Sequence, residues 1–314
     1  KEIHGFSIIN TDERYDERDY IKHSVNELEI KHTEIKISKN NFLQRLRQQI
    51  LKHDAPICTI NYFAHWQLME KINQSGYKVS ISGTGADEIF SGYMDHHLAY
   101  LKVMHDLDKK RFKEAKDDWE KKILPLVRNP YLKNYDYFIK NQFARNHITL
   151  ESDKFESFLE EDFHYEFIED FYSKDFLRNR MYNELFHEIV PVILNEDDLN
   201  AMDFSIENRS PFLDQNLFNL AQNIPTRHLI KNGLAKTLLR DAVSGYAPKK
   251  IINNPKKIGF NIPLYDYLDI NNKDVKEQIL SDSPIYSLVK RDQIENLFNL
   301  EFLPNSISKF LFNF

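Results

Sequence analysis

The chain has 314 residues, a length that allows about two domains. Apolar residues make up 41% of it and charged residues 29%, so we expect a folded chain with a packed core and exclude wholesale disorder. The formal net charge of -6 argues against a nucleic-acid partner bound through a basic surface.

The sequence also limits the compartment. No run of about 18 apolar residues occurs, so we expect no membrane partner. Cys58 is the single cysteine, which excludes an internal disulfide and favours a reducing, cytoplasmic compartment. The chain starts at Lys1 without a signal-peptide pattern, and we expect it to be a trimmed part of a larger protein.

Strand and helix patterns alternate over the first ninety residues. Short apolar or alternating runs predict strands at residues 4–9, 33–37 and 78–81. Apolar residues at helical spacing predict helices at residues 17–28, 41–50 and 61–73. The alternation predicts a parallel sheet with helices on its faces.

The rest of the chain is predicted to be mainly helical. Residues 97–195 contain no glycine and carry charged and aromatic residues at helical spacing, which predicts a block of helices. We therefore expect three parts: an α/β unit at residues 1–96, the helical block at 97–195, and a helical and loop segment at 196–314 that completes the site.

The most informative local pattern is the loop from Ser82 to Glu88, which follows the third predicted strand. Gly83 and Gly85 would let a ligand approach the backbone closely, and free N–H groups at the start of the next helix attract phosphate. Asp87 is a candidate ligand for Mg²⁺, which prefers carboxylate and phosphate oxygens. A plain tight turn with helix-capping carboxylates is the alternative.

Residues 205–214 combine charged residues with apolar anchors before a proline turn. Glu207 and Arg209 are expected to form a partly buried ion pair. Asp214 is expected to cap the next helix, whose apolar face would include Leu220. We interpret these three polar residues, together with Glu88, as structural residues near the site.

Residues 255–260 form a basic loop with a proline and a glycine. A lysine in this loop would be able to neutralise charge on a transferring or leaving phosphate. A solvated basic loop is the alternative, because surface lysines are common.

Together these segments resemble the synthetase domain of the glutamine-dependent asparagine synthetase family. The family's Ser-Gly-Glu-Gly-Ser/Ala-Asp-Glu and Gly-Gly-Tyr align with residues 82–88 and 91–93, which differ from them at Thr84 and Ser91. Its Asp-Arg-x-Ser-Met to Pro-Phe-Leu-Asp stretch aligns with residues 198–214, its Gly-x-x-Lys-x-x-Leu-Arg with 233–240, and its Lys-x-Gly-Phe with 257–260. Four motifs in the family's order, over nearly the whole chain, are more specific than any one alone.

The resemblance implies an ATP-pyrophosphatase-like parallel sheet with flanking helices and a large all-helical portion, with residues 1–96 as the C-terminal part of the α/β unit. It also implies that ATP adenylates a carboxylate, normally that of aspartate, and that glutamine-derived ammonia displaces AMP to form an amide. The cofactors would be ATP and Mg²⁺. A glutaminase domain in cis or in trans, and a homodimer, are the expected partners.

The resemblance also assigns residues to roles. Ser82 and Gly83 would contact the nucleotide, and Ile8 matches a family position beside the adenine. Asp87 would help to bind Mg²⁺–pyrophosphate. Lys257 would act catalytically by stabilising the leaving pyrophosphate.

Two differences from the family concern the acceptor. Thr84 stands at a catalytic position where the family usually has glutamate, and threonine is not a base near neutral pH. Family members often carry a basic residue shortly before the aspartate that matches Asp198, whereas here Glu196 and Asp197 precede it. The resemblance therefore implies an asparagine synthase (glutamine-hydrolysing) that acts on aspartate, or a close relative that acts on another carboxylate. From these two differences we hypothesise the second, for instance with a sugar acid as acceptor.

A third difference is the family's Ser-Gly-Gly-x-Asp-Ser pyrophosphate loop, which precedes the strand matched by residues 4–9. No two glycines are adjacent in this sequence. Cys58 lies in mid-chain and does not match the amino-terminal glutaminase nucleophile. We expect the 314 residues alone neither to hydrolyse glutamine nor to bind ATP tightly.

Two alternative functions are a β-lactam-synthetase-like cyclase and a non-catalytic assembly module, whose lost activity would be marked by Thr84. A PP-loop tRNA-modifying enzyme is disfavoured by the net charge.

Asp95, His96 and His97 form a candidate metal site. Adjacent histidines on a helix point about 100° apart, so we expect these residues to be packed or solvated instead.

Overall fold

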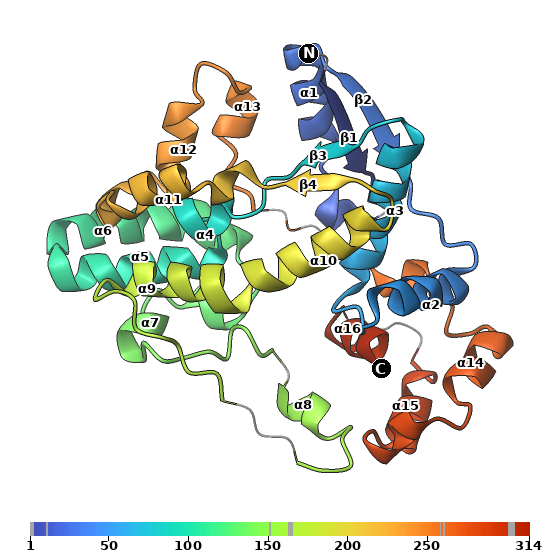
Figure 1. Cartoon of the computed structure of the whole chain (residues 1–314). Helices are drawn as coiled ribbons and strands as arrows, with labels where there is room; N and C mark the ends of the chain where they lie inside the picture. The colour runs from blue at the N-terminus through green and yellow to red at the C-terminus, as the bar shows by residue number, and fades with distance from the viewer. Residues whose placement is uncertain are drawn as a thin grey trace.

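The computed structural model describes residues 3–10, 12–150, 152–162, 166–257, 259, 261–300 and 305–314. Figure 1 shows the short strands gathered in one region and helices over most of the remainder of the described chain. No described helix is long and apolar enough to cross a membrane.

The described strands form two separate parallel pairs. β1 (His4–Ile8) pairs with β2 (Lys31–Ile35), and β3 (Val79–Ile81) pairs with β4 (Glu207–Arg209). The predicted α/β class with parallel strands is therefore confirmed. β4 lies where only a loop was predicted: it has three residues, two of them charged, and carries no apolar alternation that a sequence pattern would reveal.

The helices that connect the first strands lie close to their predicted positions. α1 (Arg18–Leu28) joins β1 to β2, and α2 (Phe42–His53) and α3 (Ile60–Gln74) join β2 to β3. Gly76 follows α3 with φ 86°, a conformation that favours glycine, and turns the chain into β3.

The middle of the chain is only partly helical. Its helices are α4 (Ala86–Phe90), α5 (Met94–Leu107), α6 (Lys109–Asp118), α7 (Tyr137–Lys140), α8 (Ser152–Glu156), α9 (Phe176–Asn183) and α10 (Val190–Met202). The prediction of a helical block is wrong for described residues between α8 and α9, which are irregular. Side chains of α9 satisfy backbone groups there: Asn183 accepts from Asp170 N–H at 2.8 Å, and Asn179 accepts from Tyr172 N–H at 2.8 Å.

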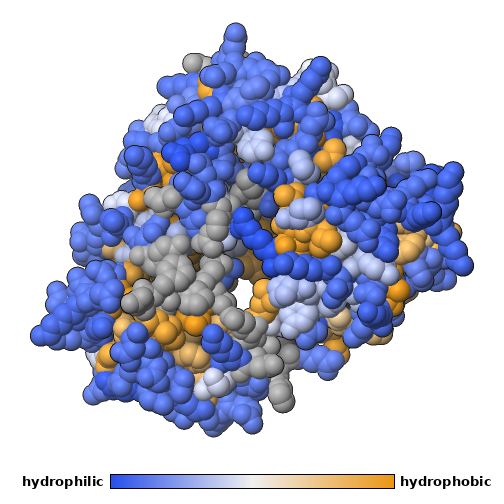
Figure 2. Space-filling view, turned by 180° about the vertical axis from the view of Figure 1, so that it is seen from behind, coloured by the Kyte–Doolittle hydropathy of each residue, from blue (hydrophilic) through white to orange (hydrophobic). Residues whose placement is uncertain are grey.

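The last third contains short helices and loops, as predicted. They are α11 (Gln215–Gln222), α12 (Thr237–Ala242), α13 (Lys249–Ile252), α14 (Lys273–Ile279), α15 (Arg291–Leu297) and α16 (Asn305–Asn313). Seen from behind, the molecule has a mostly hydrophilic surface with hydrophobic residues in separate areas, including some near the middle of that face (Figure 2).

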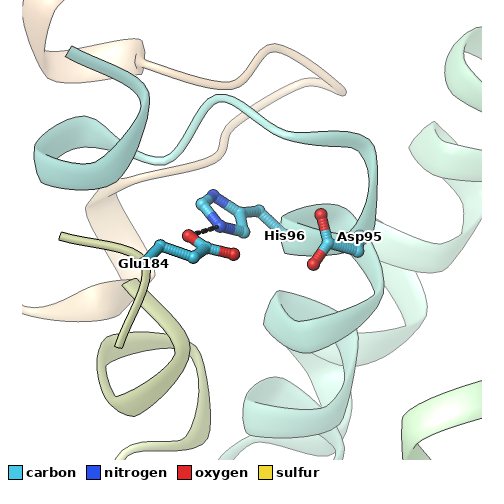
Figure 3. A group of neighbouring side chains, drawn as sticks. All are labelled: Asp95, His96 and Glu184. Carbon is cyan, nitrogen blue, oxygen red and sulfur yellow. Dashed lines mark hydrogen bonds and ion pairs between the residues drawn. The ribbon is translucent and has the colours of Figure 1, made fainter. Parts of the chain in front are cut away.

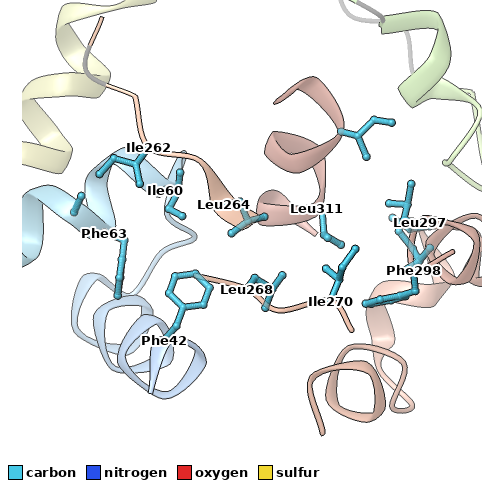
Figure 4. Packing of buried hydrophobic residues seen from close by; sticks show 14 of the residues in the cluster. Phe42, Ile60, Phe63, Ile262, Leu264, Leu268, Ile270, Leu297, Phe298 and Leu311 are labelled. Carbon is cyan, nitrogen blue, oxygen red and sulfur yellow. The ribbon is translucent and has the colours of Figure 1, made fainter. Parts of the chain in front are cut away.

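A large buried cluster joins α2 and α3 to the C-terminal third (Figure 4). The rings of Phe42 and Phe63 lie with centroids 5.0 Å apart, and Leu264 and Leu311 belong to the same cluster. Next to it, Ile262 N–H donates to Asn61 Oδ1 of α3 at 3.0 Å. This packing fixes the end of the loop that contains Lys257 against the body of the fold.

Candidate functional site

Asp87 of α4 contacts two lysines that come from distant parts of the sequence. Lys257 Nζ lies 2.7 Å from Asp87 Oδ2, and Lys236 Nζ lies 2.7 Å from Asp87 Oδ1. Lys257 belongs to the loop after α13, whereas Lys236 directly precedes α12. The structure thus brings together Asp87 and Lys257, two of the residues singled out from the sequence, and adds Lys236.

The two lysines determine the charge state of the carboxyl group. Burial would raise the pKa of Asp87, but the ammonium groups of Lys257 and Lys236 outweigh this effect and hold the pKa below its ordinary value. Asp87 is therefore ionised at neutral pH. Two ammonium groups therefore converge on one carboxylate. Ammonium groups held in this way favour an anion such as phosphate.

Two glycines allow this close packing. A β-carbon on Gly92 would fall 1.6 Å from Asp87 Oδ1, so the carboxylate occupies the space that any other residue would need. Gly85 has φ 92°, and a β-carbon there would fall 2.3 Å from Leu213 Cδ2. Gly83 differs, because the space that its β-carbon would fill is open.

Three hydroxyl groups lie at the carboxyl ends of β3 and β4. Ser82 Oγ donates to Thr84 Oγ1 at 3.1 Å and lies 3.0 Å from Ser210 Oγ. Ligands of open α/β sheets bind at this end of the strands. The hydroxyls offer neutral hydrogen-bonding groups in and next to the loop that leads from β3 to α4, the helix of Asp87.

Ser82 and Thr84 also line a cleft of about 1290 Å³ between β1 and β3. Within the described part of the chain, Ile8, Asp87 and Lys257 are not among the residues that line this cleft. Ile8 packs instead against the cluster of Figure 4. The residues predicted to bind ATP are therefore not all brought into one cavity.

Tyr93 contacts both Glu88 and Lys257. Its hydroxyl donates to the carboxylate of Glu88, which is buried, and its ring lies 5.5 Å from Lys257 Nζ. Glu88 thus faces the interior, whereas its neighbour Asp87 faces the lysines. This arrangement agrees with a structural place for Glu88 next to the site.

Residues 205–214, which follow α10, agree with the prediction only in part. Arg209 Nε lies 2.9 Å from Glu207 Oε1, but the two side chains are 58% and 62% exposed, so the expectation of partial burial is wrong. Residues two apart on a strand share a face, and this face of β4 is open to solvent. Asp214 caps α11 by accepting from Asn216 N–H and Leu217 N–H, as predicted, whereas Leu220 is 64% exposed and lies outside the apolar face.

Asp95, His96 and Glu184 lie close together in the interior (Figure 3). The guanidinium group of Arg180 lies 3.3 Å from both Asp95 Oδ2 and Glu184 Oε1, so a cation already neutralises these acids. His96 Nε2 lies 2.7 Å from Glu184 Oε2, and its Nδ1 accepts from Gly92 N–H at 3.2 Å. The cluster is a packed ionic network that supports the Gly92 turn, in agreement with the prediction of packed residues.

Lys236 and Ser210 are the site residues that sequence reasoning missed. Lys236 is the lysine of the motif at residues 233–240, and this motif was the available signal. Ser210 lies in a segment that was interpreted as structural, and only the pairing of β4 with β3 places its hydroxyl beside Ser82.

Comparison with known proteins identifies the family of this chain. Residues 1–306 match the model of the asparagine synthase family. The glutamine-hydrolyzing asparagine synthetase 1 of Bacillus subtilis (strain 168) is 26% identical over 321 residues, which cover 95% of this chain and 49% of the relative. Asparagine synthetase 3 of the same organism is 25% identical over 280 residues, covering 86% of this chain and 40% of that relative. The chain spans about half the length of the curated relatives it matches, and it belongs to the asparagine synthase family.

Proposed function

We propose that this chain is the synthetase part of a ligase that uses ATP to convert a carboxylate into an amide, with ammonia supplied from glutamine. Family membership supports the reaction class. The observation that carries the proposal is the contact of Asp87 with Lys236 and Lys257 beside the hydroxyls at the ends of β3 and β4. We also propose that the strand pairs belong to an ATP-pyrophosphatase-like sheet.

The chemistry needs a cationic site for a leaving group. A carboxylate oxygen of the acceptor attacks the α-phosphorus of ATP, and pyrophosphate leaves with the electron pair of the broken P–O bond. Ammonia then attacks the acyl carbon, and AMP leaves with the electron pair of the C–O bond. Lys257 and Lys236 would stabilise the charge that develops on the departing pyrophosphate. Ser82 and the open backbone at Gly83 would hold the nucleotide.

In this proposal Asp87 is the residue that would hold Mg²⁺. The ionised carboxylate of Asp87 is an oxygen ligand, and Mg²⁺ is usually held by one or two carboxylates together with substrate phosphates. When bound, the ion would neutralise phosphate charge next to the two lysines. Asp87 therefore has two functions in this proposal: it orients both ammonium groups and contributes one oxygen to the cation.

The acceptor is proposed to be a carboxylate other than aspartate. Thr84 offers a hydroxyl where the family usually has a carboxylate, so it would orient the acceptor by a hydrogen bond. Asp197 lines the cleft, and burial, together with the neighbouring charge of Glu196, raises its pKa to about 7. A carboxyl group that keeps its proton near neutral pH does not bind a second carboxylate on the acceptor as a cation would, which favours a monocarboxylate such as a sugar acid.

The test is pyrophosphate release by the complete enzyme with ATP, Mg²⁺, glutamine and a panel of acceptors that includes aspartate and several sugar acids. We expect release with a sugar acid at a rate well above that with aspartate. Efficient formation of asparagine would overturn the proposed acceptor and keep the amidation. Absence of release with every acceptor would overturn the enzymatic proposal and support a non-catalytic assembly module.

A further inference from the structure

Lys236 holds its ammonium group beside Asp87 from an unusual backbone conformation. Its φ is 58°, in the left-handed region, where the β-carbon of a residue other than glycine is crowded. Such a conformation persists only where the surrounding structure determines it, and residues held in this way cluster at functional sites. The groups that bind the peptide bonds on either side of residue 236 therefore determine where its ammonium group lies.

Arg240, in α12, binds both of these peptide groups. Its Nε donates to Ala235 C=O at 2.7 Å, and its backbone N–H donates to Lys236 C=O at 2.9 Å. The N–H of Lys236 in turn donates to Ser91 C=O at 3.0 Å, directly before the Gly92 turn. Because peptide groups are planar, the orientations of two successive ones set φ and ψ of the residue between them. These hydrogen bonds therefore fix the backbone of Lys236.

The far end of the Arg240 guanidinium group binds the last turn of α13. Its Nη1 donates to Ile251 C=O at 3.3 Å and also to Ile252 C=O. Figure 1 shows α12 and α13 next to each other, and the loop that contains Lys257 starts directly after α13. The packing around Ile262 fixes the other end of this loop. Arg240 therefore holds the end of the loop that is nearer to α13.

Arginine suits this position because of its geometry. A guanidinium group has five N–H donors in a planar, rigid fork, whereas lysine has one nitrogen on a flexible stem. Within the described chain no carboxylate lies at ion-pair distance from Arg240, and its side chain donates to carbonyl groups. A cap for the end of α13 alone would not need the contact with Ala235. The contacts are those of a bridge between two backbone segments.

We infer that Arg240 is a positioning residue, which places Lys236 and Lys257 at the site by holding the two segments that carry them in one arrangement. Lys236 depends on the contact of Nε with Ala235 C=O, and Lys257 depends on the contacts of Nη1 with α13. The catalytic consequence rests on the proposed function, whereas the arrangement itself rests on these hydrogen bonds.

Two substitutions separate the contacts of Arg240. In Arg240→Gln the amide nitrogen takes the place of Nε, so the donor to Ala235 C=O remains and the contacts with α13 are lost. In Arg240→Lys a methylene carbon takes the place of Nε, so the donor to Ala235 C=O is lost and the charge stays near α13. Arg227→Lys is the matched control, because Arg227 is exposed and contacts His228. Circular dichroism checks that each variant folds, and because each substitution tests one lysine, the failure of one variant leaves the other as a test.

Amide hydrogen exchange in the complete enzyme reports on the arrangement without a need for activity. The amide of Asn253 donates to Lys249 C=O at the end of α13, and that of Lys236 donates to Ser91 C=O, both at 3.0 Å. We expect Arg240→Gln to speed exchange at Asn253 roughly tenfold and to leave Lys236 protected. Arg240→Lys should speed exchange at Lys236 by a similar factor and change Asn253 less.

Pyrophosphate release by the complete enzyme tests the catalytic consequence. We expect either substitution to slow release roughly tenfold or more, because a small displacement of a group that stabilises the transition state is costly. A double-mutant cycle assigns each loss to one lysine. Arg240→Gln should cost little more in Lys257→Ala and its full factor in Lys236→Ala, and Arg240→Lys should show the reverse.

Several outcomes would overturn the inference. Losses of rate that multiply in every background would show that Arg240 supports the fold in general. Unchanged exchange and rate in both substitutions, or losses as large in Arg227→Lys, would also contradict it. If the wild-type enzyme releases no pyrophosphate with any acceptor, the proposed function fails, and the exchange pattern alone decides whether Arg240 holds both segments.

Discussion

Gly92 lies so close to Asp87 that a β-carbon on Gly92 would fall 1.6 Å from the carboxylate oxygen Oδ1. The same β-carbon would fall 2.5 Å from Lys236 Cε. A carboxylate, an ammonium stem and a backbone turn therefore share one small space. The absence of a side chain at residue 92 is a condition for the cluster.

Gly92→Ala should displace the carboxylate of Asp87 and lower stability. The added methyl group overpacks a buried site, which typically costs about 1–3 kcal/mol. We expect a lower urea midpoint and a loss of pyrophosphate release that exceeds the loss expected from the unfolded fraction. Wild-type activity and stability in this variant would contradict the geometry of the cluster.

Gly83→Ala should leave the stability unchanged but weaken nucleotide binding. Gly83 is exposed, and nothing in the described structure lies within 4 Å of the position of its added β-carbon. We expect the free energy of unfolding to stay within about 0.5 kcal/mol of the wild type. If a nucleotide approaches this backbone, the methyl group will weaken ATP binding in the complete enzyme, measured by equilibrium titration. Unchanged affinity would remove Gly83 from the nucleotide site.

Local sequence patterns were sufficient for some parts of this fold. The apolar runs and helical spacing located β1, α1 and α3 to within a few residues. The loop after β3 was also correctly placed, because strand, glycines and acidic pair are adjacent in the sequence.

Other features depend on tertiary contacts. β4 is short and charged, and only its pairing with β3 makes it a strand. The irregular residues before α9 carry an aromatic and charged pattern similar to that of a helix, but side chains of Asn179 and Asn183 accept hydrogen bonds from their backbone. Lys236 and Lys257 reach Asp87 from separate segments, and no spacing along the chain specifies that meeting.

Removal of either lysine tests the cationic site. Lys257→Ala should slow pyrophosphate release by the complete enzyme about 10²–10³-fold, the usual cost of losing one group that stabilises transition-state charge. Lys236→Ala should have an effect in the same direction. Each variant should also raise the pKa of Asp87, because one of the two ammonium groups that lower it is gone, and NMR titration of the carboxyl group can follow this change.

Lys256→Ala is the matched control for these variants, because Lys256 is an exposed neighbour in the same loop. It should leave both the rate and the pKa of Asp87 close to the wild type. Equal losses in Lys256→Ala and Lys257→Ala would show that only the overall charge of the loop matters.

Asp197→Asn should stabilise the chain at alkaline pH. Burial, and then the neighbouring charge of Glu196, raises the pKa of Asp197 from 3.8 to about 7, so the folded chain keeps a proton that the unfolded chain releases. Stability from this group is fully present below pH 3.8 and is lost as the pH rises through about 7. At pH 8 the buried carboxylate is charged, and the neutral amide avoids that cost, which we expect to be about 1–3 kcal/mol. Urea unfolding at pH 5, 6, 7 and 8 measures the difference, with the exposed Asp198→Asn as control. A stability difference that stays constant over this pH range would contradict the raised pKa.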